Sequence, residues 1–305
     1  WRTCWSGCRR GTAEVLRLVL PKGSIERATI ELFAAADLPV VRSSDVDYRG
    51  RIDDPRVDEV RILRPQEIPR YVADGLFDIG ITGRDWIEET GADVLSLGEL
   101  AYSKATSSPI RVVLAVHRDS PVQSVSDLPA GARVSTEYPE LTRRALEKHG
   151  VQAEIRLSYG ATEAKIPDIA DAVVEITETG RALAAAGLRI VDTLLVSRTE
   201  LVANHEAAQD PTKRHAMEQI LTLLLGTLEA RGKVLLKLNV SGERLAAVLA
   251  VLPALKAPTV SELSGDGGFA VETVVPKDQV NILIPDLKDR GATDIIELPL
   301  SKIVH

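Results

Sequence analysis

Cysteine is scarce in this sequence: its 305 residues include two, Cys4 and Cys8, with three residues between them. Two cysteines cannot hold together a disulfide-rich fold, and so few thiols are typical of a reducing compartment, which predicts a cytoplasmic protein. No further Cys/His pair lies nearby to complete a zinc site. We therefore interpret residues 1–15, which match nothing that follows, as a disordered or non-native leader.

Histidine is also sparse, and the common nucleotide-binding loops are missing. None of the five histidines stands in an H-E-x-x-H spacing or beside a cysteine, which argues against a histidine-centred metal site or catalytic triad. There is no Walker sequence, and no G-x-G-x-x-G follows a strand-like run. A bound nucleotide must therefore be held by some other kind of loop.

Long apolar runs and an excess of basic residues are absent as well. No stretch approaches the roughly 18 apolar residues of a membrane-spanning helix, and Arg9 and Arg10 stand where the apolar core of a secretory signal would begin. Lys and Arg number 37 against 44 Asp and Glu, for a formal net charge of -7. This balance predicts neither nucleic acid nor membrane as a partner, so any bound anion must be held by local donors.

What the sequence does contain is a regular alternation of strand-like and helix-like patterns up to residue 203. Such alternation predicts an α/β fold with a mostly parallel sheet in each of two halves, and Glu200–Ala203 reads as an extension of the strand 188–196. A long amphipathic helix follows from Pro211 to Arg231. The tail then reads as strand, helix, two strands, helix and strand, which is the ferredoxin-like order.

The first strand-to-helix turn is a candidate ligand site. Leu16–Leu20 reads as a strand, and Pro21, Lys22, Gly23 and Ser24 lead into a helix for which Ser24 is the expected N-cap. Lys22 thus stands at the carboxyl end of a strand, where ligands of open α/β sheets collect. The alternative, a solvated lysine in an ordinary turn, remains open from this stretch alone.

A second turn of the same kind follows the strand-like run Leu76–Ile81. There Thr82, Gly83, Arg84 and Asp85 precede a helix. The arginine could bind a phosphate and the aspartate a polar base edge; equally, the two could be a surface ion pair and a helix cap.

The most suggestive turn lies in Asp171–Gly187. A β-branched run passes through Thr177, Glu178, Thr179 and Gly180 into an alanine-rich helix. Small residues let successive N–H groups converge on an anion at a helix start, and carboxylates just before the turn suit the hydroxyls of a sugar phosphate. The alternative is an ordinary strand-to-helix turn.

These pieces, taken in order, resemble one family. Pro21–Gly23, Leu63–Pro65, Phe77–Asp85, Glu137–Pro139, Gly160–Lys165 and Asp171–Arg181 resemble the motifs of the long form of ATP phosphoribosyltransferase, an enzyme that opens histidine biosynthesis. The likeness runs from Leu16 to His305. It implies a pentosyltransferase that joins N1 of ATP to the anomeric carbon of phosphoribosyl pyrophosphate and releases pyrophosphate, with Mg²⁺ as cofactor.

The resemblance also implies a fold, namely a two-lobed core like type II periplasmic binding proteins and a C-terminal ferredoxin-like regulatory domain. We expect lobe I to comprise residues 16–108 and 189–232, lobe II residues 109–188, and the regulatory domain residues 233–305. The family further suggests homodimers that assemble into hexamers, and free histidine as a feedback inhibitor.

Site residues carry over by motif. Glu175 is expected to hold the ribose hydroxyls with Glu163 nearby, and the catalytic set is Glu175, Glu163 and Lys22. The residues expected to bind phosphoribosyl pyrophosphate are Asp171, Glu175, Thr177, Glu178, Thr179, Gly180, Arg181 and Ala182. Those expected on the ATP and pyrophosphate side are Lys22, Gly23, Arg64, Gly83, Arg84, Asp85 and Tyr138. The motifs assign no metal ligands.

Two positions depart from the family pattern. Ala182 stands where a Thr or Ser is usual, so one hydroxyl donor to the phosphate is missing. Among the expected histidine contacts, Asn239, Thr259 and Asp294, the first stands where an Asp is often found, which predicts weaker inhibition. A solute-binding protein of the same architecture, without chemistry, is the alternative function, and a catalytically silent homologue is a third.

Overall fold

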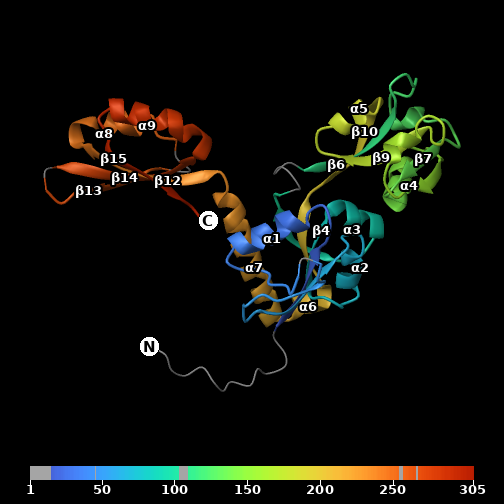
Figure 1. Cartoon of the computed structure of the whole chain (residues 1–305), viewed down its shortest axis with the longest axis horizontal. Coiled ribbons are helices and arrows are strands. Elements are labelled where there is room, and N and C mark those ends of the chain that lie inside the picture. The colour runs from blue at the N-terminus through green and yellow to red at the C-terminus, as the bar shows by residue number, and fades with distance from the viewer. Residues whose placement is uncertain (1–14, 45, 103–108, 254–256, 266) are drawn as a thin grey trace, which may run out of the picture. The chain divides into compact units, whose positions relative to one another are not determined.

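A computed structural model gives the structure of the chain and describes residues 15–44, 46–102, 109–253, 257–265 and 267–305. The expected leader, with Cys4 and Cys8, lies outside the described residues apart from Val15. The chain divides into two compact units, Trp1–Leu221 and Thr222–His305. Each unit is built around its own sheets (Figure 1).

The first half of the larger unit is a six-stranded sheet. Its strand order is β2 (Arg49–Gly50), β3 (Val57–Leu63), β1 (Leu16–Pro21), β4 (Ile79–Gly83), β11 (Thr199–Ala203) and β5 (Leu95–Leu100). Strands β1, β3 and β4 of this half are each followed by a helix, respectively α1 (Glu26–Ala35), α2 (Ile68–Ala73) and α3 (Arg84–Thr90). The expectation that Ser24 caps α1 was wrong: Ile25 holds the cap position, and no side chain bonds the helix start.

The second half is a five-stranded sheet in the order β10 (Leu188–Ser197), β6 (Ile110–His117), β9 (Ala172–Thr177), β7 (Arg133–Thr136) and β8 (Glu154–Leu157). It carries α4 (Pro139–Lys148) and α5 (Arg181–Ala185). Two short 3₁₀ turns, η1 (Val125–Asp127) and η2 (Thr162–Lys165), complete this half.

Both sheets are mixed, which corrects the expectation of mostly parallel ones. β1 pairs in parallel with β3 and β4, and β7 with β8 and β9, but β11 runs antiparallel to β4 and β5, and β6 runs antiparallel to β9 and β10. The antiparallel strands adjoin the two chain crossings between the sheets. This is the two-lobed topology implied by the resemblance.

The return crossing lies later in the chain than expected. β10 belongs to the five-stranded sheet, so residues 189–197 lie in the second lobe and the chain re-enters the first at Thr199. Glu200–Ala203 is correspondingly not an extension of the preceding strand; it forms β11 in the other sheet. The single residue Arg198 separates the two strands, and hydrophobic patterning does not reveal the break.

A buried carboxylate fixes the long helix to the first sheet. Asp78 is 2% exposed and accepts hydrogen bonds from the Arg17 backbone (2.8 Å), the Arg17 guanidinium (3.1 Å) and Lys213 Nζ (2.9 Å). Lys213 lies in the first turn of α7 (Pro211–Ala230), which follows α6 (His205–Gln209). Burial acts to raise the pKa of Asp78, but the bonds from Arg17 and Lys213 outweigh it and lower that pKa.

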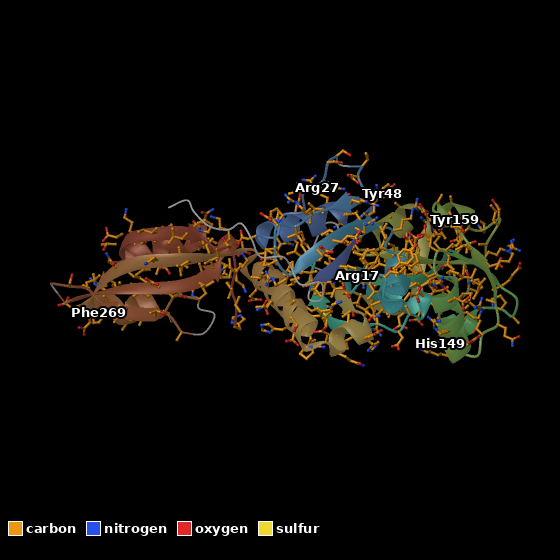
Figure 2. All side chains as sticks on the ribbon, turned by 90° about the horizontal axis from the view of Figure 1, so that it is seen from below. Arg17, Arg27, Tyr48, His149, Tyr159 and Phe269 are labelled. Carbon is orange, nitrogen blue, oxygen red and sulfur yellow. The ribbon has the colours of Figure 1, made fainter. Side chains whose placement is uncertain are left out.

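The C-terminal unit confirms the predicted ferredoxin-like order. Its elements are β12 (Lys233–Ser241), α8 (Gly242–Leu249), β13 (Thr259–Glu262), β14 (Gly268–Pro276), η3 (Lys277–Gln279), α9 (Val280–Asp289) and β15 (Thr293–Pro299). The strand order is β13-β14-β12-β15. Alternate residues of β12, such as Leu236 and Leu238, form the core with both helices, and Phe269 packs against it (Figure 2).

No helix among the described residues has the length and apolarity needed to cross a membrane.

Replacing Asp78 with Asn is expected to destabilise the larger unit by roughly 2 kcal/mol in denaturant unfolding. The loss should fall below the range for fully buried pairs because Arg17 and Lys213 remain partly exposed. Since the folded-state pKa of Asp78 is lowered, its contribution is present above about pH 3.9 and disappears as the pH falls through the folded-state value. Glu154→Gln, which alters an exposed ion pair with Arg156, is the control and should change stability by less than about 0.5 kcal/mol; equal effects would contradict this account.

Candidate active site

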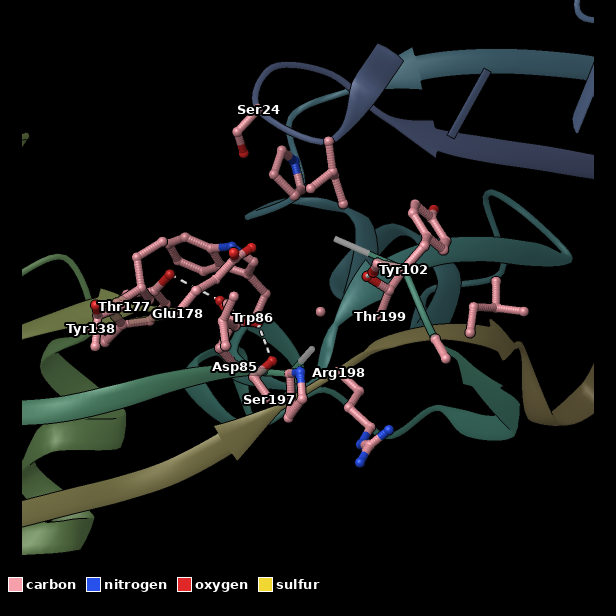
Figure 3. Close-up of a pocket in the computed structure, with 18 residues that line it drawn as sticks. Ser24, Asp85, Trp86, Tyr102, Tyr138, Thr177, Glu178, Ser197, Arg198 and Thr199 are labelled. Carbon is pink, nitrogen blue, oxygen red and sulfur yellow. Dashed lines mark hydrogen bonds between the residues drawn. The ribbon is translucent and has the colours of Figure 1, made fainter. Parts of the chain in front are cut away.

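A cavity of about 350 Å³ opens where the two halves of the larger unit meet. Pro65, Gly83 and Leu100 line it from the first half, and Ile176 and Thr177 from the second (Figure 3). These residues stand at the carboxyl ends of β4, β5 and β9 or just beyond β3, the edge at which α/β sheets hold their ligands.

Asp85 is the buried polar centre of this cavity. It is 3% exposed at the start of α3, and its carboxylate accepts hydrogen bonds from Tyr138 Oη (2.8 Å) and Ser197 Oγ (2.7 Å). The Asp85 backbone N–H donates in turn to Ser197 Oγ (3.0 Å). Figure 3 shows both side chains pointing at this carboxylate. Asp85 is therefore not part of a surface ion pair, and Gly83 rather than Asp85 holds the cap position of α3.

The surroundings of Asp85 govern its protonation. Burial raises the pKa of Asp85, and the hydrogen bonds from Ser197 and Tyr138 offset this only in part. Burial and the neighbouring Asp85 charge raise the pKa of Tyr138 as well, so the phenol keeps its proton and remains the donor.

Gly83 is required by the position of this carboxylate. A Cβ on Gly83 would lie 2.1 Å from Asp85 Oδ1, closer than atoms can approach. The glycine in the Thr-Gly-Arg-Asp turn thus serves the close packing of Asp85, which the turn reading alone does not predict.

Helices α3 and α4 clasp one another beside the cavity. The rings of Trp86 and Tyr138 lie 4.5 Å apart between centroids, tilted by 35°. Glu89 of α3 accepts hydrogen bonds from the N–H groups of Glu140 (3.1 Å) and Leu141 (2.8 Å), so it caps α4 from the other half. This clasp places Tyr138 over Asp85.

The predicted strand, turn and helix after Asp171 are present. β9 ends at Thr177, Gly180 adopts a positive φ of 77° and donates its N–H to Thr177 Oγ1 (2.7 Å), and α5 begins at Arg181. The Arg181 N–H faces Thr179 Oγ1 at 3.5 Å. Thr177 and Glu178 line the cavity, and Ala182 is exposed in the first turn of α5.

Glu175 lies in β9 two residues before this turn. Burial, with the charges of Glu137 and Glu163, raises the pKa of its carboxyl group, while hydrogen bonds from the Ile176 N–H (3.0 Å) and the Thr162 hydroxyl oppose the shift. The structure therefore brings Glu163 and Glu175 close enough for their charges to interact, although the two residues belong to separate motifs of the sequence.

Asp171 does not belong with this group. It precedes β9, at the opposite end of the strand from the turn, and binds the Arg133 backbone N–H (2.8 Å) and guanidinium (2.7 Å). These bonds lower the pKa of Asp171. The structure therefore does not bring Asp171 to the turn, because it lies at the opposite end of β9 from Thr177.

The cationic residues expected on the ATP side stand at the same sheet edge but outside the cavity lining. Lys22 follows β1, with Nζ 3.9 Å from the centre of the Tyr48 ring, and Gly23, at a φ of 96°, donates its N–H to Glu26. Arg64 is exposed after β3. Arg84 pairs with Glu88 at 2.7 Å.

Several lining residues were missed from the sequence. Ser197 ends β10 at the return crossing, and Thr199 begins β11; neither belongs to a motif. Trp86 directly follows the Phe77–Asp85 motif and reads as an ordinary apolar helix residue. Only the position of the return crossing places Ser197 at the cavity, and the sequence pattern does not reveal that position.

The three expected effector residues of the C-terminal unit do not form one cluster. Asn239 Nδ2 donates to Asp294 Oδ2 at 3.0 Å. Thr259 lies on β13, two strands from β12, and lines a separate hollow of about 280 Å³ with Glu272 and His305. The pair Asn239–Asp294 is therefore one candidate and Thr259 another.

Comparison with known proteins identifies the family. The sequence model described as ATP phosphoribosyltransferase matches residues 64–226, and that described as HisG, C-terminal domain, matches residues 230–302. The ATP phosphoribosyltransferases of Pelotomaculum thermopropionicum and Solibacter usitatus are each 48% identical over 290 residues, which is 95% of this chain and 99% of theirs. The chain belongs to the ATP phosphoribosyltransferase family.

A solved ATP phosphoribosyltransferase from Thermotoga maritima, described as a HisG:HisZ complex, superposes with a TM-score of 0.60 at 27% identity. The match covers 99% of that chain but 70% of this one.

Removing the cap that Glu89 supplies should loosen the clasp of this family member. We expect Glu89→Ala to lower the free energy of unfolding by about 1 kcal/mol, the usual value of a helix cap, and Glu89→Gln to lose less because it keeps an acceptor oxygen. Thermal unfolding followed by circular dichroism measures both. Glu147→Ala, an exposed change on α4, is the control; a Glu89→Ala protein as stable as that control would contradict the capping role.

Proposed function

We propose that the cavity between the two halves is where this chain performs the family's reaction, the first step of histidine biosynthesis, in which N1 of ATP joins the anomeric carbon of phosphoribosyl pyrophosphate. The observation that carries the assignment is the turn at the end of β9. It opens into the cavity through Thr177 and Glu178, and the half-buried Glu175 stands two residues before it.

The phosphoribosyl side would be bound by this turn. Glu175 can accept hydrogen bonds from two ribose hydroxyls, and Glu163 lies near it. The 5-phosphate would meet the Thr177–Arg181 backbone, the Thr179 hydroxyl and the Arg181 side chain. Because Ala182 offers no hydroxyl, backbone N–H groups must provide that part of the contact.

The ATP and pyrophosphate side would be bound from the first half. Asp85 and Tyr138 line the cavity, and Gly83 allows their close packing. Lys22, Arg64 and Arg84 bring positive charge to the same edge, with Gly23 allowing the turn that presents Lys22. Cations at this edge suit the charge that develops on departing pyrophosphate.

The reaction requires the protein mainly to position the two substrates and to stabilise the charge that develops. Displacement at an anomeric carbon passes through an oxocarbenium-like state, and ATP N1 already carries the attacking lone pair, so no general base is needed. When bound, Mg²⁺ would neutralise the leaving pyrophosphate. No group of three or more His, Cys, Asp or Glu in the described residues is placed to hold a metal ion.

Glu175→Ala should remove the ribose contact while leaving the fold intact. We expect kcat/KM for phosphoribosyl pyrophosphate to fall by about a hundredfold, because hydrogen bonds to a charged group are lost. Initial rates are followed by the absorbance of the phosphoribosyl-ATP adduct, and the melting temperature serves as the check on folding. Glu154→Ala, on the exposed strand β8, is the control, and near-normal turnover of Glu175→Ala would refute the assignment. An unaltered absorbance with the native protein would favour a solute-binding role.

We further propose that histidine inhibits this protein through the C-terminal unit, that the chain acts in the cytoplasm and that it forms dimers and hexamers as the family suggests. The pair Asn239–Asp294 would face the ammonium group of the effector with a single negative charge. With the family's usual Asp at position 239, the pair would carry two negative charges.

The weak-inhibition prediction can be tested at Asn239. Asn239→Asp places two carboxylates within hydrogen-bond distance, and their repulsion is relieved when a cation binds between them. We expect histidine to inhibit this variant at a concentration at least about threefold lower than the native protein, given the strength of charged hydrogen bonds. A histidine titration of the initial rate measures it, and strong inhibition of the native protein with no gain in the variant would contradict the prediction.

A further inference from the structure

A chain of hydroxyl groups leads from Lys165 towards the cavity. Ser158 is 2% exposed and Thr162 fully buried, and their hydroxyl oxygens lie 3.0 Å apart. Lys165 Nζ donates to Ser158 Oγ, and the Thr162 hydroxyl donates to the carboxylate of Glu175. Thr162 and Lys165 belong to η2, which packs on β9.

Elementary valence fixes the direction of every bond in this chain. An ammonium group can only donate and an ionised carboxylate can only accept, whereas each hydroxyl has one proton to give. Because Thr162 gives its proton to Glu175, Ser158 must give its proton to Thr162 and accept from Lys165. All three bonds therefore point the same way, an arrangement in which each bond polarises and strengthens the next.

The chain of hydroxyl groups stabilises the carboxylate of Glu175. This carboxylate is half-buried and stands near Glu137 and Glu163, and no basic side chain among the described residues forms an ion pair with it. The hydroxyls carry the influence of the Lys165 charge to it through buried space, and the ammonium group itself stays outside the cavity. With the Ile176 N–H, which binds Oε1 at 3.0 Å, they leave the carboxylate little freedom to rotate.

We infer that Lys165, Ser158 and Thr162 form a positioning chain that orients the Glu175 carboxylate for the ribose hydroxyls of phosphoribosyl pyrophosphate. The inference rests on the proposed ribose role of Glu175. None of the three acts on the substrate directly; Thr162 is the member in contact with Glu175, and the other two act through it.

The test compares Thr162→Val with Thr162→Ser in the full-length protein. Valine keeps the shape of threonine but removes the hydroxyl, so the KM for phosphoribosyl pyrophosphate should rise about tenfold, while the KM for ATP changes less than twofold. Serine restores the hydroxyl and should bring the KM back to within about threefold of the native value. Melting temperatures accompany every variant, because a purely structural role would lower stability without separating the two KM values.

Lys165→Met examines the far end of the chain and keeps the test valid if Thr162→Val fails to fold, since Lys165 is only partly buried. It should raise the KM for phosphoribosyl pyrophosphate about threefold, and should add little in the Thr162→Val background, as expected of groups that act in series. Full additivity, an unchanged KM in both single variants, or equal impairment of Thr162→Val and Thr162→Ser would overturn the inference. If Glu175→Ala is impaired while these variants are normal, the positioning chain fails and the ribose role stands; if Glu175→Ala is normal, the proposed function fails first.

Discussion

The buried carboxylate of Asp85 sets the relation between the two halves of the larger unit. A charged or proton-bearing oxygen at this depth is costly unless hydrogen bonds satisfy it, and its partners Tyr138 and Ser197 both come from the second half. The halves therefore cannot separate at this point without leaving polar atoms unpaired. Gly83, which has no side chain, leaves space for the Asp85 carboxylate. The contact between α3 and α4 holds the ring of Tyr138 in place.

A second carboxylate stands on β9, the strand that reaches the cavity through Ile176 and Thr177. Glu175 belongs to a strand rather than a helix, and hydroxyl and backbone donors restrain it while neighbouring carboxylates repel it. Asp85 is thus held by groups that join the halves, whereas Glu175 is held by groups of its own half. Asp85 can therefore fix the shape of the cavity, while Glu175, which does not join the two halves, can bind a ligand.

Local patterns predicted much of this and failed where the answer was nonlocal. The C-terminal order of strands and helices rests on local patterns, and on β12 the buried Leu236 and Leu238 alternate with half-buried neighbours, a signal that needs no distant partner. The strand, turn and helix around Gly180 were equally local. The motif did not report that Asp171 lies at the opposite end of β9 from the turn, and Ser197 was missed because nothing in a sequence reports which sheet the next strand will join.

The return crossing explains why that omission matters. Thr199, the first residue of β11, donates from its hydroxyl to the Tyr102 carbonyl (3.1 Å), and Tyr102 in turn bonds Thr29 of α1 through its phenol (2.8 Å). These bonds tie Thr199 to Tyr102 and Tyr102 to α1, and both Thr199 and Tyr102 line the cavity. A ligand that contacts the turn after β9 and the edge of β4 consequently binds at the joint itself, where a small change in the angle between halves alters its contacts on both sides at once.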